Sequence, residues 1–130
     1  MELGTRTAAL KAVLDAMPGA VAEPMAANRS KSGEPLVLLY KIMGKMFAIL
    51  QVRNLENVIL KCDPHLAEVL REQFAGVGHR SHLDPRFWIA VDLDADVPPD
   101  EVARLAAASY DLVKAGLTRK QRAALEALSA

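Results

Sequence analysis

Apolar residues recur at helical spacing near the start of the 130-residue chain and at strand spacing further on. The first helix is predicted where they follow the i, i+3, i+4, i+7 spacing of one helical face, at Leu10, Val13, Leu14 and Met17. Thr5 or Thr7 is expected to cap its start, and Pro18-Gly19 to end it. A short strand is expected near 20–25, followed by a loose basic loop.

Between residues 36 and 61 the chain contains three short apolar segments joined by tight connections, the pattern of an antiparallel meander. The segments are LVLLYKIM (36–43), KMFAILQV (45–52) and NVILK (57–61). Successive strand side chains point to opposite faces. One face is therefore expected to hold Leu38, Tyr40, Ile42, Met46, Ala48, Leu50, Val52, Val58 and Leu60. The other should hold Lys41, Lys45, Gln51, Arg53, Asn57 and Lys61, with Phe47, Ile49 and Ile59 among them.

A second helix is predicted after these strands, with Asp63 as its N-cap and Pro64 at its first position. Its buried stripe should be Leu66, Val69, Leu70 and Phe74, and Gly76 should stop it. Residues 78–86 are expected to form a loop or a twisted edge strand, and FWIAVDL (87–93) a further strand.

Two more helices complete the predicted order. Pro98-Pro99 should open a helix that runs to Gly116, with an inner face of Val102, Leu105, Ala106, Ser109, Leu112 and Val113. Thr118 and Gln121 form a capping box for a short final helix within 118–130, with Leu125 and Leu128 inward. The order predicts one α+β domain over 1–130, in which helices pack on one face of an antiparallel sheet in two layers.

Composition narrows the class of protein. The single cysteine, Cys62, excludes an intrachain disulfide and suits a reducing cytoplasm. We find no signal peptide and no apolar run of the roughly 18 residues that span a bilayer. The net charge is zero, which argues against a dedicated high-affinity nucleic-acid binder. Cations nevertheless gather between 28 and 61, and acids between 92 and 101.

Several motifs resemble the MmcQ/YjbR family of small bacterial proteins. They are GKMFA (44–48), LKCDP (60–64), LREQF (70–74), His82 with Arg86 and Trp88, VDLD (91–94) and SYDLV (109–113). The resemblance implies a frataxin-like (CyaY-like) α+β fold whose β-hairpins form a double wing suited to DNA. The chain departs from the family between Glu23 and Leu36, where an Asn/Ser/Gly-rich segment replaces a compact turn.

The first candidate site is basic. Lys41, Lys45, Arg53 and Lys61 on the strand face, with Arg80, His82 and Arg86 on the later loop, could contact phosphates, and Trp88 or Phe87 could stack on a base. Lysines on a solvated sheet face also serve simply to prevent aggregation.

The second candidate is the acidic run Asp92, Asp94 and Asp96, with Asp100. An EF-hand starting at Asp92 would need glycine and glutamate where Val97 and Ala103 stand, so that type of calcium loop is excluded. A looser cation-binding patch, of the kind frataxin relatives use for iron, stays an open hypothesis. The alternative is that these acids are there because negative charge is favoured at a helix N-terminus.

The remaining polar residues do not form a pattern that indicates an enzyme. His79, His82 and Cys62 lack the converging ligands that zinc requires, and Ser81, His82 and Asp84 are merely adjacent in sequence. We therefore expect a non-catalytic domain that has no cofactor. This domain is expected to bind DNA weakly. The alternative is a protein-interaction module with an apolar patch at Phe47, Ile49 and Ile59.

Overall fold

The computed structural model describes residues 4–25, 37–52, 56–79 and 83–128. Its elements are α1 (Thr5–Asp15), β1 (Val21–Pro24), β2 (Val37–Ile42), β3 (Lys45–Gln51), β4 (Asn57–Lys61), α2 (Pro64–Gln73), β5 (Val77–Gly78), β6 (Trp88–Asp92), α3 (Pro99–Ala115) and α4 (Arg119–Leu128). The predicted order of helices and strands is confirmed, with the short strand β5 added near the loop that precedes β6.

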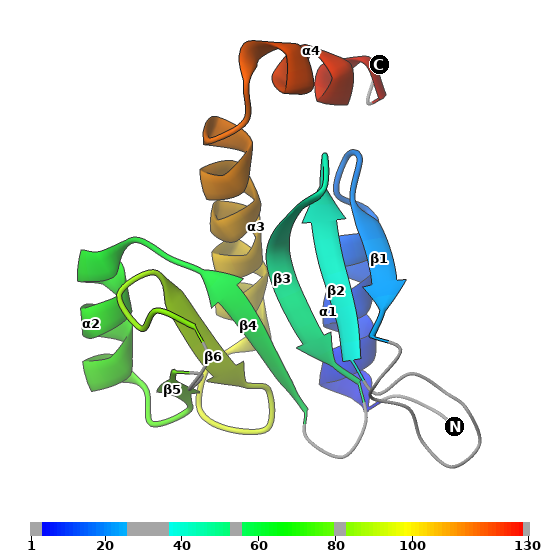
Figure 1. Cartoon of the computed structure of the whole chain (residues 1–130). Helices are drawn as coiled ribbons and strands as arrows, with labels where there is room; N and C mark the ends of the chain where they lie inside the picture. Colours follow the sequence, from blue (N-terminus) through cyan, green and yellow to red (C-terminus); the bar gives the residue numbers. More distant parts are fainter. Residues whose placement is uncertain (1–3, 26–36, 53–55, 80–82, 129–130) are drawn as a thin grey trace.

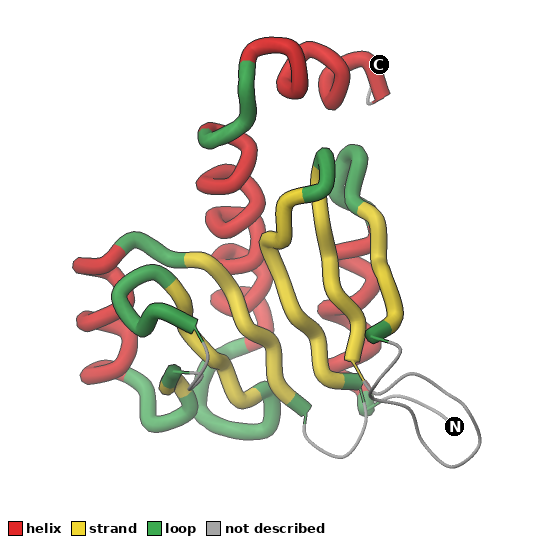
Figure 2. Tube along the Cα trace, viewed as in Figure 1, coloured by secondary structure: helices red, strands yellow, loops and turns green. Residues whose placement is uncertain are grey.

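The strands form one antiparallel sheet in the order β1-β2-β3-β4-β6-β5. Helices α1 and α3 lie behind this sheet, α2 lies at its β5–β6 end, and α4 crosses above the β2–β3 hairpin (Figures 1 and 2). The predicted α+β class, an antiparallel sheet with helices on one face, is therefore confirmed.

The core lies between the sheet and the helices. All but Met46 of the strand side chains predicted to face inward do so, and they pack against Leu10 and Leu14 of α1 and Val102, Leu105 and Val113 of α3. The buried strand residues are Leu38, Tyr40, Ile42, Ala48, Leu50, Val52, Val58 and Leu60. Burial of these side chains is the main stabilising term of the fold, at about 1.5–3 kcal/mol for each large one.

A β-bulge in β3 makes part of the face prediction wrong. Tyr40 pairs with Ala48 but Lys41 pairs with Met46, so Phe47 is an extra residue that shifts the alternation. Phe47 is fully buried, with its ring 5.4 Å from that of Tyr110 on α3. Met46 takes the outward position predicted for Phe47, and Lys45 moves to the helix side, where its ammonium donates to the Gly116 carbonyl at 3.4 Å.

Helix starts agree only partly with the sequence. The Asp63 carboxylate caps α2 as predicted, accepting hydrogen bonds from the N–H groups of His65 and Leu66. The predicted threonine cap of α1 is wrong, because Gly4 is the N-cap residue and Thr7 lies buried within the helix. The capping box of α4 is confirmed by reciprocal bonds between Thr118 and Gln121.

Four leucine and valine positions predicted to be buried are exposed. Leu66 and Val69 on α2, Leu112 on α3 and Leu128 on α4 all lie at the surface, the last with 68% of its area accessible. Helix α2 instead buries Ala67 and Leu70, and it ends at Gln73, before Gly76. The helical spacing located each helix but gave its inner face only approximately.

Candidate nucleic-acid interface

The predicted basic set divides into two groups. Arg53, Arg80 and His82 lie outside the described residues, so their positions stay predictions. Lys41, Lys45, Lys61, Arg86 and Trp88 are described, and they come from the ends of four strands and from one loop.

Lys61 and Trp88 lie side by side. They are cross-strand partners at the end of the β4–β6 ladder, and both alternate with buried inward residues, so both belong to the outer face that carries no helix. Directly opposed residues in an antiparallel pair have Cβ atoms about 4.5–5.5 Å apart. Within the described residues no hydrogen bond or ion pair engages the Lys61 ammonium, and Trp88 is half-buried. An available cation therefore stands next to an aromatic surface.

The other strand lysines are less available. On the outer face, Lys41 forms an ion pair with Glu23 of β1, with the ammonium 2.8 Å from the carboxylate. Lys45 lies on the helix side because of the bulge. The expectation that Lys41, Lys45 and Lys61 share one face is therefore wrong for Lys45, although all three remain at the same end of the sheet.

Arg86 is held by a local carboxylate. Asp84 accepts from the Arg86 backbone N–H at 2.9 Å and from its guanidinium at 2.8 Å. The side-chain and backbone hydrogen bonds from Arg86 lower the pKa of Asp84. The guanidinium also lies 5.3 Å from the centre of the Phe87 ring. Arg86 is exposed but already paired, so a phosphate would compete with Asp84 for it.

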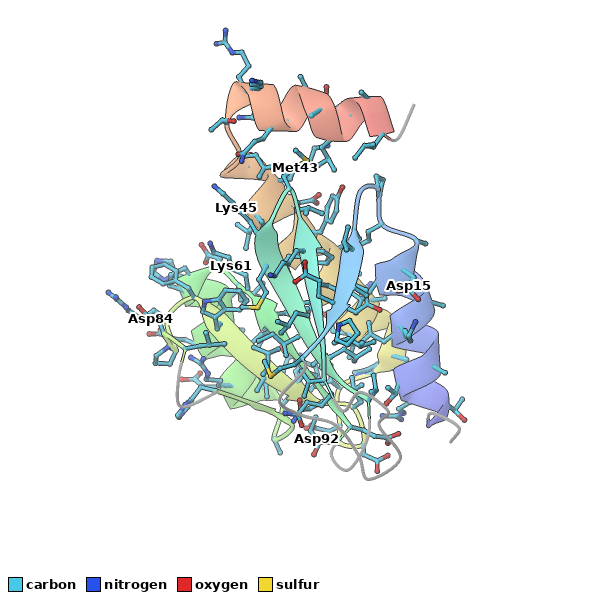
Figure 3. All side chains as sticks on the ribbon, turned by 45° about the vertical axis from the view of Figure 1, so that its right-hand side comes forward. Asp15, Met43, Lys45, Lys61, Asp84 and Asp92 are labelled. Atoms are coloured by element: carbon cyan, nitrogen blue, oxygen red, sulfur yellow. The ribbon has the colours of Figure 1, made fainter. Side chains whose placement is uncertain are left out.

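Three lysines lie at one end of the sheet, and Asp92 lies at the other. Lys41, Lys45 and Lys61 lie at strand ends that the register places at one end, whereas Asn57 pairs with Asp92 at the other. Figure 3 shows Lys45 and Lys61 toward the α4 end of the molecule and Asp92 at the opposite end. The lysine end is not uniformly positive, because Asp63 and Asp111 lie beside Lys61.

The acidic run has a structural explanation. Asp92 accepts from the Asp94 N–H, and Asp96 accepts from the N–H groups of Ala75 and Gly76 at 2.8 and 2.7 Å. These bonds from Gly76 and Ala75 lower the pKa of Asp96. Among the described residues no three His, Cys, Asp or Glu side chains are grouped so that they could hold a metal ion.

The thiol and the predicted apolar patch are also mostly buried. Burial, and then the charge of Asp63, raises the pKa of Cys62, so this thiol is not activated by the start of α2. Phe47 and Ile59 are fully buried and Ile49 is half-buried, so the patch predicted for a protein partner is wrong for two of its three members. No helix in the described parts of the chain has the length and apolar content needed to cross a membrane.

The family model described as YjbR matches residues 16–112, most of the chain and all the strands of the sheet. The chain belongs to the YjbR family. It is 38% identical over 71 residues to the uncharacterized protein YjbR of Escherichia coli K12, and equally so to that of strain O157:H7. This match covers 54% of the chain and 60% of the curated relative.

Solved structures agree with this family assignment. The crystal structure of Deinococcus radiodurans protein DR2400, with the domain DUF419, superposes with a TM-score of 0.76 at 27% identity, covering 90% of this chain and 85% of that one. A protein from Pseudomonas syringae gives 0.66 at 18% identity over 84% and 98% of the two chains, and supports the fold alone.

Arg71 is a residue of this YjbR chain whose role the sequence did not predict. It lies on α2, and its guanidinium donates to the carbonyls of Pro85 at 2.6 Å and Trp88 at 2.8 Å. It thereby fixes the start of β6, the strand that presents Trp88. Its place in the LREQF motif (70–74) was the available signal, but helical spacing alone presents Arg71 as an ordinary surface cation.

Proposed function

We propose that the chain binds nucleic acid weakly on the outer face of its sheet, with Lys61 contacting backbone phosphates and Trp88 stacking on a base. The observation that supports this most directly is the Lys61–Trp88 cross-strand pair. Phosphate contacts supply most of the affinity in sequence-independent binding, and an aromatic ring adds about 1–3 kcal/mol per stacked base. The DNA-binding role and the cytoplasmic location expected from the sequence belong to this proposal.

Single strands are the preferred ligand in this proposal. A base can reach Trp88 only when it is unstacked, which is cheap in a single strand and costly in a duplex. Because Lys41 and Arg86 are already paired with Glu23 and Asp84, they contribute less than Lys61. Weak rather than tight binding follows, in keeping with the zero net charge.

The test is fluorescence anisotropy of a labelled oligonucleotide, single-stranded and duplex, titrated at several salt concentrations. The salt dependence should give a log–log slope of about −0.7 per phosphate contact for the single strand. Lys61→Gln should weaken binding and reduce the magnitude of that slope by about one contact. Lys120→Gln, an equal charge change on the exposed face of α4, should leave both unchanged.

Equal effects of the two lysine substitutions would refute the Lys61 interface, because binding would then depend on the total charge of the chain and not on the position of Lys61. Binding that ignores salt would refute phosphate contact altogether.

The competing proposal, a protein-interaction module, loses most of its predicted patch because Phe47 and Ile59 are buried. Its test is a pull-down with the intact chain. Recovery of one stable protein partner without nucleic acid, together with no oligonucleotide binding, would favour it.

A further inference from the structure

A groove of about 320 Å³ lies between α2 and α3, on the helix side of the sheet. Leu66 of α2 forms one wall and α3 forms the other, while Cys62 and Ile89 form part of the floor. Its volume is at the lower end of the roughly 300–1,000 Å³ typical of small-molecule sites.

Helix α3 presents a second apolar stripe to this groove. Leu105, Ala108, Leu112 and Ala115 follow helical spacing, and all line the groove. Leu112 and Leu66, on opposite walls, keep 40% and 39% of their areas accessible, although the sequence predicted both to be buried. The alanines leave space between the larger side chains. These side chains leave an apolar groove that is open to solvent.

The ionisable lining residues favour a cation. They are Asp63, Asp111 and Lys61, so carboxylates outnumber the ammonium. Asp63 already accepts hydrogen bonds from two backbone N–H groups of α2. Asp111 shows no hydrogen bond or ion pair within the described residues, and it lies on the same helix as the apolar stripe. A carboxylate ligand would be repelled by both acids, whereas a protonated amine would gain an ion pair with Asp111, which is exposed at the rim.

We propose that this groove binds a small organic molecule that has an apolar body and one protonated amine. The apolar body fills the space beside Ala108 between Leu66 and Leu112, and the amine pairs with Asp111 at the rim. The groove shares Lys61 with the proposed nucleic-acid interface, but its apolar walls lie on the helices rather than on the outer sheet face.

Isothermal titration calorimetry with phenylbutylamine, phenylbutanol and phenylbutyrate tests the charge preference with one apolar body. The amine should bind more tightly than the alcohol, and the carboxylate most weakly. Asp111→Asn should lower the affinity for the amine about twofold to fivefold, the range for a solvent-exposed ion pair. It should leave the alcohol unchanged.

A cavity-filling variant locates the binding. Ala108→Leu places a larger side chain in the groove and should abolish amine binding. Ala107→Leu makes the same change at the neighbouring exposed position, which does not line the groove, and should not alter binding. Ala115→Leu serves as a second filling variant should the first fail to fold.

Equal binding of the three probes, or amine binding that survives both filling variants, would overturn the proposal. Absence of amine binding to the unmodified chain would also overturn it, and would leave the groove to an apolar segment of a protein partner.

Discussion

The hydroxyl of Ser109 accepts a hydrogen bond from the backbone N–H of Lys61 at 2.8 Å, and it donates one to the Phe47 carbonyl at 2.6 Å. Ser109 lies on α3, so a helix side chain bridges β4 and β3. The bridge lies just beyond Ala48–Leu60, the last pair of the β3–β4 ladder. The bridge satisfies two backbone groups and fixes the strand end that carries Lys61.

Ser109→Ala should destabilise the fold by about 1–3 kcal/mol, because it leaves the Lys61 N–H and the Phe47 carbonyl without their partner. Urea unfolding followed by circular dichroism measures this change. Ala107→Ser adds a hydroxyl at an exposed position of the same helix. Its free energy of unfolding should stay within about 0.5 kcal/mol of that of the unmodified chain. A loss no larger for Ser109→Ala than for this control would show that water replaces the bridge.

The β2–β3 hairpin turns through Met43 and Gly44, whose φ angles are 48° and 80°. Gly44→Ala should cost about 1–2 kcal/mol, since an L side chain disfavours the left-handed region. The cost is conformational, because no atom lies within 4 Å of the added Cβ. Gly78→Ala is a matched control, since its added Cβ is equally unobstructed but its φ is not positive. Equal stability of the two variants in urea would contradict this backbone explanation.

The Tyr40 phenol joins the sheet to the first helix. Its O–H donates to the Asp15 carboxylate at 2.7 Å, and Lys11 also pairs with that carboxylate. Burial and the neighbouring carboxylate raise the pKa of Tyr40 well above its usual value. Tyr40→Phe should therefore lower the free energy of unfolding by about 1 kcal/mol, the usual net value of one hydrogen bond. A double-mutant cycle that combines Asp15→Asn with Tyr40→Phe should show a coupling free energy between the two residues. A coupling of zero would show that the hydrogen bond is not formed in solution.

Asp96 should contribute to stability in a pH-dependent way. The backbone N–H groups of Gly76 and Ala75 lower its pKa below the ordinary 3.8. A lowered carboxyl pKa means that the stabilisation is fully present above 3.8 and is lost as the pH falls through the native value. Asp96→Asn should thus lower the melting temperature at neutral pH, and the difference should shrink in acid. Asp94→Asn, whose carboxylate accepts no bond within the described residues, should show no such trend. A difference for Asp96→Asn that is constant with pH would contradict the role of its charge.

The sequence predicted the elements better than it predicted their faces. Asp63-Pro64 and the Thr118–Gln121 box are local signals, so they located their helix starts correctly. At the bulge, the Phe47 ring contacts Tyr110, which is 63 residues away in the sequence, and strict alternation could not reveal this contact. For the same reason Lys45 was assigned to the wrong face. The ion pair of Lys41 with Glu23 likewise requires the β1–β2 register, which only the fold supplies.

Trp88 and Lys61 together form the proposed nucleic-acid contact, and Trp88 is the only tryptophan of the chain. Its intrinsic fluorescence therefore reports on this site alone. Titration with single-stranded oligonucleotide should quench the emission by stacking, and added salt should reverse the quenching. Lys61→Gln should weaken the quenching, while Lys120→Gln should not. Oligonucleotide binding detected by anisotropy with no change in Trp88 emission would contradict a contact at Trp88.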